Sequence, residues 1–312
     1  MTHVIFSEAR SQPARGALFM ALAVLMFAGM DVLTKHMALL YAVPLVVFMR
    51  YAANFAMIVA VFGPGQGRRL IAVQRPWMVL LRAVCLATSS LCAALAFHRM
   101  PLAETVSIIF LAPFGVMLLA GPILRERVGP LQWMATAAGL IGLLLIVRPG
   151  SGLDPVGVFC ALMTAGASIV YNMLSRSLAR SETTQAMLFW TALVGTMIFG
   201  AALPWSWPPV MPSLTDFGLF AALGGLATLG HFFFTQSARA APASVIAPVN
   251  YLQLVWSGLL GWLFFGHIPD QLALAGMGLI AVGGVSAALW PVIAAHLPIN
   301  RAAKTGILAE AA

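Results

Sequence analysis

Long apolar stretches alternate along this chain with short breaks that hold charged residues, proline or glycine. A helix needs about 20 apolar residues to cross the hydrocarbon core of a bilayer, whereas a membrane-spanning strand needs about 10 residues of alternating polarity. The stretches have the length and uniformity of helices. We therefore expect ten membrane-spanning helices, at residues 16–36, 44–63, 77–98, 102–123, 130–148, 155–178, 184–204, 214–238, 243–265 and 271–291.

The composition favours the same interpretation. Hydrophobic residues make up 61% of the 312 residues, and charged residues only 8%. Soluble domains carry about 25% charged residues because their surfaces face water. In a bilayer core the backbone must satisfy its own hydrogen bonds. The predicted fold class is therefore all-α and polytopic, and the short connections leave no room for an inserted soluble domain.

The net charge of +8 raises the question of nucleic-acid binding. Such a site needs Lys and Arg clustered on one face, but here they are spread over the connecting segments, so no nucleic-acid partner is expected. In membrane proteins, cations mark the cytoplasmic segments instead. If the N-terminus is cytoplasmic, the inner segments hold Arg10, Arg15, Arg68, Arg69, Arg75, Arg125, Arg127, Arg176, Arg180, Arg239, Arg301 and Lys304, and the outer ones hold Lys35, Arg99 and Arg148. Both termini are thus expected on the cytoplasmic side of a bacterial inner membrane.

The N-terminal segment and the three cysteines suggest neither a signal peptide nor a metal site. Arg10 and Arg15 precede the first apolar stretch as in a signal peptide, but the stretch is long and no convincing cleavage site follows, so we interpret it as the first transmembrane helix. Cys85, Cys92 and Cys160 lie inside apolar stretches without metal-ligand spacing. No metal or other cofactor is expected.

The two halves of the chain match at a single offset. A shift of 141 residues places the first five predicted helices on the second five without a gap; the matched pairs include Gly16 with Gly157, Asp31 with Asn172, Lys35 with Arg176, Phe48 with Phe189, Pro101 with Pro242 and Gly142 with Gly283. Because each half holds an odd number of spans, the second half must be inverted. Inverted repeats of this kind are typical of transporters, with the substrate site between the repeats. We predict cytoplasmic tails at 1–14 and 292–312, and repeats at 15–150 and 151–291.

The first half also carries three recognisable motifs: Pro101-Leu-Ala-Glu-Thr-Val-Ser-Ile-Ile-Phe-Leu-Ala-Pro113, Leu124-Arg-Glu-Arg-Val-Gly129, and Gly139-x-x-Gly142 with Arg148-Pro-Gly150. They resemble the fourth and fifth helices of the drug/metabolite transporter superfamily, EamA type. The second half is less similar, since His267 stands where that family usually has Glu. The resemblance covers residues 16–291. It implies a 5+5 fold with alternating access and a cavity lined mainly by helices 1, 3, 4, 6, 8 and 9. Within the family, the chain looks most like exporters of aromatic and other neutral amino acids.

Polar residues recur at helical spacing within several apolar stretches. Polar groups that face lipid are costly, so these stripes are expected to face protein or water. They either line a cavity or form hydrogen bonds between helices. The expected cavity residues are Ser89, Thr164, Ser168, Tyr171, Thr228, His231, Asn250, Tyr251 and Gln253. The fifth and tenth stretches hold glycines suited to close helix packing instead, namely Gly139, Gly142, Gly276 and Gly283.

Pro113 and Pro248 lie inside predicted helices, where each removes a backbone hydrogen bond. They form either a gate or hinge near the substrate, or static kinks. Asp31 and Arg50 lie toward the predicted outer side. A lone charge at that depth is costly, so we expect them to pair or to line an outer vestibule, with snorkelling to headgroups as the alternative for Arg50.

Two other charged residues have simpler expected roles. Arg82 is expected to snorkel to the cytoplasmic surface. Glu104 lies at the start of its predicted helix, where a carboxylate interacts favourably with the helix dipole.

A cavity with hydroxyls, amides, Tyr171, Tyr251 and His231 suits a zwitterion with an aromatic or apolar side chain. A phosphate ester would need cations at mid-depth, and a lipophilic cation would need a deep carboxylate; the sequence predicts neither feature, and both solutes stay open as alternatives. Because no acid is expected at mid-membrane, we favour facilitated export down a gradient, with a proton-coupled exporter of another metabolite or drug as the alternative.

An enzyme would need clustered catalytic residues such as paired histidines or a Gly-x-Ser-x-Gly turn, and the sequence contains neither. The expected function is therefore transport rather than catalysis. The expected partners are a small-molecule solute and membrane lipid, and no second subunit is required.

Overall fold

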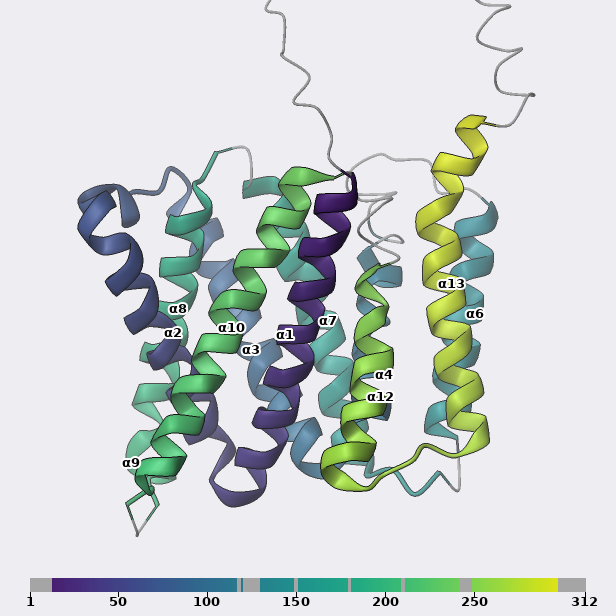
Figure 1. Ribbon diagram of the computed structural model, residues 1–312, viewed down its shortest axis with the longest axis horizontal. Coiled ribbons are helices and arrows are strands. Elements are labelled where there is room, and N and C mark those ends of the chain that lie inside the picture. The colour runs from purple at the N-terminus through teal and green to yellow at the C-terminus, as the bar shows by residue number, and fades with distance from the viewer. Residues whose placement is uncertain are drawn as a thin grey trace, which may run out of the picture.

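A computed structural model of the chain describes residues 13–116, 119, 130–148, 151–178, 181–208, 211–241 and 249–296. Over these residues the chain is helical and contains no strand. Most helices stand side by side as an upright bundle (Figure 1). The elements are α1 (Pro13–Leu40), α2 (Val43–Gln66), η1 (Gly67–Leu70), α3 (Pro76–Arg99), α4 (Leu102–Ile109), α6 (Pro130–Val147), α7 (Pro155–Leu178), α8 (Thr184–Ala201), α9 (Leu203–Ser206), α10 (Leu214–Ala240), α12 (Leu252–Phe265) and α13 (Gln271–His296).

Six of the described helices are long and apolar enough to cross a membrane, and the shorter apolar ones are Leu102–Val116, Trp133–Val147, Leu252–Phe265 and Gln271–Ser286. Each predicted stretch overlaps one of these helices. The protein is therefore an all-helical, multi-pass membrane protein. Ten complete spans in an inverted 5+5 arrangement stay a prediction.

Local sequence explains where several helices begin and end. At α10, the Ser213 hydroxyl accepts a hydrogen bond from the Asp216 backbone N–H at 3.2 Å, and the Asp216 carboxylate accepts one from the Ser213 N–H at 2.9 Å. This reciprocal pair satisfies backbone donors that an N-terminus leaves free. α3 begins at Pro76, whose missing N–H costs nothing there. α12 ends at Gly266, which has a φ of 65°.

Two pairs of long helices enclose the centre of the bundle: α1 packs along α10, and α3 packs along α7. A third pair, α6 with α13, stands at one edge (Figure 1). Here the backbones approach closely, because a Cβ atom built on Gly142 would lie 2.5 Å from the Gly276 carbonyl oxygen. One built on Gly283 would lie 3.1 Å from the Ala135 oxygen, and one on Gly139 would lie 3.0 Å from the Phe114 ring. The packing role predicted for these glycines is confirmed.

Candidate functional site

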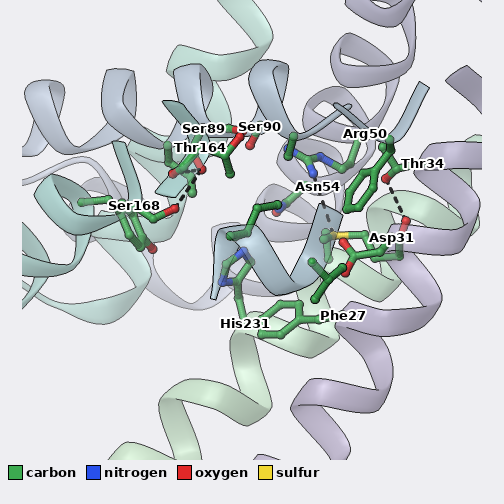
Figure 2. Close-up of a pocket in the computed structure, with 18 of the residues that line it drawn as sticks. Phe27, Asp31, Thr34, Arg50, Asn54, Ser89, Ser90, Thr164, Ser168 and His231 are labelled. Carbon is green, nitrogen blue, oxygen red and sulfur yellow. Dashed lines mark hydrogen bonds between the residues drawn. The ribbon is translucent and has the colours of Figure 1, made fainter. Parts of the chain in front are cut away.

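A cavity of about 220 Å³ lies within the bundle, and its walls combine aromatic rings with polar side chains (Figure 2). Lining residues come from α1, α2, α3, α4, α7, α8, α10 and α12. The family resemblance implies a cavity lined by predicted helices 1, 3, 4, 6, 8 and 9, which correspond to α1, α3, α4, α7, α10 and α12. All six contribute lining residues, and α2 and α8 contribute as well. α6 and α13 supply none of its lining residues, in keeping with their role in packing.

Six of the predicted cavity residues line this cavity: Ser89, Thr164, Ser168, Tyr171, His231 and Gln253. Thr228, Asn250 and Tyr251 are not among its lining residues. The Thr228 hydroxyl donates to the Gly224 carbonyl of its own helix at 2.8 Å, which satisfies the group without water or solute. Tyr251 is buried with its ring edge against Phe110, at 5.4 Å between centroids.

The hydroxyls between α3 and α7 both line the cavity and form hydrogen bonds between the two helices. Ser89 and Ser168 are joined by a hydrogen bond of 3.0 Å between their hydroxyls. The Thr164 hydroxyl donates to the Ser89 carbonyl at 3.3 Å. These groups therefore hold the two helices together while they line the cavity wall (Figure 2).

Asp31 and Arg50 both line this cavity rather than a separate outer vestibule. Asp31 accepts a hydrogen bond from the Gln253 amide at 3.0 Å, which joins α1 to α12. The Arg50 guanidinium carbon lies 5.0 Å from the centroid of the Tyr51 ring, and its NH1 group donates to the Met30 sulfur at 3.9 Å. Asp31 and Arg50 form no ion pair within 4 Å, although the Arg50 charge acts on Asp31 electrostatically; an amide binds the acid and a π face lies beside the cation. Their pairing stays a prediction.

Arg82 is buried behind the cavity wall and does not snorkel, with 5% of the residue exposed. Its guanidinium donates to the hydroxyls of Ser175 at 2.7 Å, Thr191 at 2.8 Å and Tyr171 at 2.7 Å. It also donates to the Met187 carbonyl at 3.3 Å. These neutral oxygens solvate the cation inside the protein. Sequence spacing did not reveal them, because they come from other helices. Because Tyr171 and Thr191 line the cavity, Arg82 holds two wall hydroxyls in place.

Several polar lining residues were missed at the sequence level: Thr34, Tyr51, Asn54, Ser90 and Thr191. The Tyr51 and Ser90 hydroxyls are 2.9 Å apart. The side-chain oxygen of Asn54 is buried and has no hydrogen-bond partner among the described residues. Arg50 and Asn54 are four residues apart and so lie on one face of α2. That spacing was the available signal for a polar stripe on the second helix.

Breaks occur in both helices that were predicted to contain a proline hinge. After α4 ends at Ile109, Phe110 and Leu111 form a turn, and Pro113 lies in the short helical stretch that follows. Pro248 lies outside the described residues, and α12 begins only after a turn at Tyr251. Phe110 and Tyr251 are separated by the repeat offset of 141 and contact each other. Whether the breaks act as hinges stays a prediction.

A multi-pass helical bundle around a polar cavity is the architecture of a solute transporter. The model of the EamA-like transporter family matches residues 14–148 and again residues 155–289, and the chain belongs to this family.

Relatives with known names support the same class. A riboflavin transporter of Rhizobium johnstonii is 29% identical over 86% of this chain and 90% of its own. The pseudopaline exporter CntI of Pseudomonas aeruginosa is 30% identical over 87% and 95%. An S-adenosylmethionine uptake transporter of Rickettsia prowazekii is 23% identical over 80% and 84%. A solved crystal structure with 21% identity matches 89% of this chain with a TM-score of 0.64, which shows a shared fold.

These findings establish a membrane transporter of the EamA family, and they point to transport rather than catalysis. The named solutes differ from one relative to the next. None of the three names supports the expectation of amino-acid export.

Proposed function

We propose that this protein carries an amphoteric organic solute, with one cationic and one anionic group, across a bacterial inner membrane by alternating access. The observation that carries the proposal is the pair of opposite charges, Asp31 and Arg50, in one cavity without an ion pair between them. A buried charge without a direct ion-pair partner is costly, even where an opposite charge acts on it from across the same cavity. The ammonium and carboxylate of a solute would each give one of the two residues such a partner.

The remaining lining residues suit the body of such a solute. Phe27, Tyr51, Phe97, Phe110 and Tyr171 offer ring surface to an apolar or aromatic group. The unpartnered Asn54 oxygen, one helical turn from Arg50, would accept a hydrogen bond from a solute N–H or O–H. Aromatic and other neutral amino acids fit this description. Since relatives are named for pseudopaline and S-adenosylmethionine, the proposal extends to other amphoteric metabolites.

Alternating access requires two halves that exchange roles, and two features support the predicted inverted repeat. The family model matches once in each half. With the offset of 141, α1 corresponds to α7 and α3 corresponds to α10. The contact of α1 with α10 then has its counterpart in the contact of α3 with α7.

Facilitated export is our preferred mode, but one observation favours proton antiport as the second candidate. Asp31 lines the cavity itself. An ionisable group within a transport pathway is a typical proton carrier. Uptake by proteoliposomes with and without a pH gradient separates the two modes: accumulation against a concentration gradient, driven by pH, would establish antiport.

The charge requirement is tested by competition. Purified protein in proteoliposomes is assayed for exchange of labelled phenylalanine. Inhibition by unlabelled phenylalanine is compared with inhibition by phenethylamine and by 3-phenylpropionate, each of which lacks one charge. Labelled S-adenosylmethionine serves as an alternative probe. We expect the analogues with a single charge to compete at least about tenfold more weakly.

Two variants complete this test. Asp31→Asn and Arg50→Gln should each lower exchange by at least about tenfold, because each removes the partner of one solute charge. Thr228→Val, whose hydroxyl bonds within its own helix, is the control and should exchange normally. Equal competition by the analogues, or unchanged exchange in both charge variants, would contradict the proposal.

A further inference from the structure

A second polar cluster lies at the end of the bundle where α1 and α3 end and α4 begins. It consists of Lys35 on α1, Glu104 in the first turn of α4, and His267 just after α12. Lys35 and Glu104 are buried, with 8% and 4% of each residue exposed. None of the three lines the solute cavity.

The cluster nevertheless borders the cavity directly. Thr34, next to Lys35, lines the cavity wall, and so does Val106, two residues after Glu104. The Lys35 ammonium donates to the carbonyl of Phe97, another lining residue, at 2.7 Å and to that of Met100 at 2.6 Å. The cluster therefore forms the rim of the cavity at the end predicted to face outward.

Within the cluster, one hydrogen bond joins α4 to the segment that follows α12. His267 Nε2 and Glu104 Oε1 are 2.7 Å apart. The second carboxylate oxygen, Oε2, is buried and has no hydrogen-bond partner among the described residues. The Lys35 charge acts on this carboxylate electrostatically, but its ammonium donates its hydrogen bonds to the end of α3. A buried carboxylate that is only half satisfied favours a fully charged partner on its bonded side.

His267 is placed to become that partner. Its side chain is 39% exposed, so water reaches the imidazole while its Nε2 faces the buried acid. Histidine is the side chain that ordinarily changes charge between about pH 5 and pH 8. The pair thus connects external pH to a contact between two helices that line the cavity.

We propose that Glu104 and His267 form a proton-binding site that latches this end of the cavity shut. A proton taken from water by the imidazole gives an imidazolium, and its hydrogen bond to the Glu104 carboxylate becomes charge-assisted, which is shorter and stronger than a neutral one. Loss of that proton to water returns a neutral imidazole and weakens the link. The ends of α4 and α12 then separate more readily, and access to the cavity rises with pH.

Other ionisable groups at this end do not replace the pair. Arg99 binds Asp154 at 3.0 Å, and its hydrogen bond holds the pKa of Asp154 below the usual range. The backbone N–H of Ala273, with Arg148, does the same for the pKa of Asp270, so both acids stay charged over this range. The other histidines on packed elements are His98, which donates to the Ala38 carbonyl at 2.7 Å, and the exposed His36.

The latch is tested by cysteine accessibility, which needs no solute. Cys85, Cys92 and Cys160 are replaced by Ala, and Ala93, which lines the cavity, is replaced by Cys. A membrane-impermeant methanethiosulfonate reagent is applied from the predicted outer side at about pH 5.5 and pH 7.5. The labelling rate of this parent protein is compared with that of the same protein carrying His267→Gln as well. The comparison removes the pH dependence of the thiol itself, which both proteins share. We expect about fivefold slower labelling at the lower pH in the parent, relative to His267→Gln.

Two further variants sharpen the outcome. His267→Arg keeps a permanent cation beside Glu104 and should label slowly at both pH values. His36→Gln is the matched control and should keep the pH dependence of the parent. Identical profiles in the parent and His267→Gln, or fast labelling of a monodisperse His267→Arg protein, would overturn the proposal. The exchange assay with phenylalanine is separate, so failure of the transport proposal would not be mistaken for failure of the latch.

Discussion

At the scale of single residues, Arg82 shows how a charge is kept inside this bundle. A buried cation is costly unless its donors find acceptors. Arg82 finds three hydroxyls and one carbonyl, and its guanidinium carbon also lies 4.5 Å from the centroid of the Tyr171 ring. It therefore orders part of the cavity wall while remaining behind it.

Replacing Arg82 should be more damaging than replacing a surface arginine. We expect Arg82→Gln to lower the free energy of unfolding by about 3 kcal/mol, because several buried acceptors lose a charged donor together. Arg82→Lys should recover only part of this loss, since an ammonium does not reproduce the planar fork. Denaturant unfolding of the purified protein in detergent measures both. Arg99→Gln, in an ion pair whose arginine side chain is 46% exposed, should change stability by less than about 1 kcal/mol; a similar loss in both would contradict this account.

The candidate site was only partly predictable from residue spacing. Ser89 and Ser168 were found because hydroxyls on two helices that face each other recur at helical intervals. Thr228 satisfied the same rule, but its hydroxyl bonds to its own backbone, which spacing does not reveal. Arg82 and Asn54 were misjudged or missed because their environment depends on which helices meet around them, and that is a property of tertiary packing.

At the scale of helices, the contact between α6 and α13 depends on the absence of side chains. Gly142 and Gly276 face each other, and a Cβ on either would lie 2.5 Å from the carbonyl oxygen of the other. Close backbone approach of this kind drives helix association in membranes through van der Waals packing. Gly278, two residues along α13, has open space around it.

Alanine substitutions at these glycines separate packing from helix propensity. Gly276→Ala should destabilise the protein by about 1–3 kcal/mol, because the added methyl group forces the two backbones apart. Gly278→Ala is the matched control on the same helix and should be neutral or slightly stabilising, since alanine is the better helix former. Thermal unfolding in detergent compares the two variants. Equal effects would show that the close contact contributes nothing.

Hydrophobic stretches predicted the existence of the helices better than their ends. The first stretch was expected at 16–36, but α1 runs from Pro13 to Leu40. Hydropathy placed the boundary beside Lys35, yet its ammonium binds carbonyls inside the protein and the helix continues to Leu40. The interruption at Phe110 was also hidden, because an apolar sequence has the same hydropathy whether or not its helix is broken.

At the scale of the whole molecule, three polar connections gather at the end of the bundle that is predicted to face outward. Tyr41 donates to Asp216 at 2.8 Å, which joins the segment after α1 to the start of α10. The ion pairs Arg99–Asp154 and Arg148–Asp270 similarly join segments between consecutive helices. If the halves are inverted, positions related by the offset of 141 must lie on opposite faces of the membrane. Ala72, between η1 and α3, corresponds in this way to Ser213, just before α10.

This pair gives a direct test of the inverted repeat. Both residues are exposed, so each is replaced by Cys in a background without other cysteines. Ser213→Cys removes the N-cap hydroxyl of α10 at a cost of about 1 kcal/mol, which a helix packed along α1 should withstand. In intact cells an impermeant thiol reagent should label Ser213→Cys and should reach Ala72→Cys only after the inner membrane is permeabilised, because the cation-rich segment with Arg68, Arg69 and Arg75 is expected to be cytoplasmic. Labelling of both cysteines from outside would place corresponding loops on one face, and a parallel repeat would then replace the inverted one on which alternating access depends.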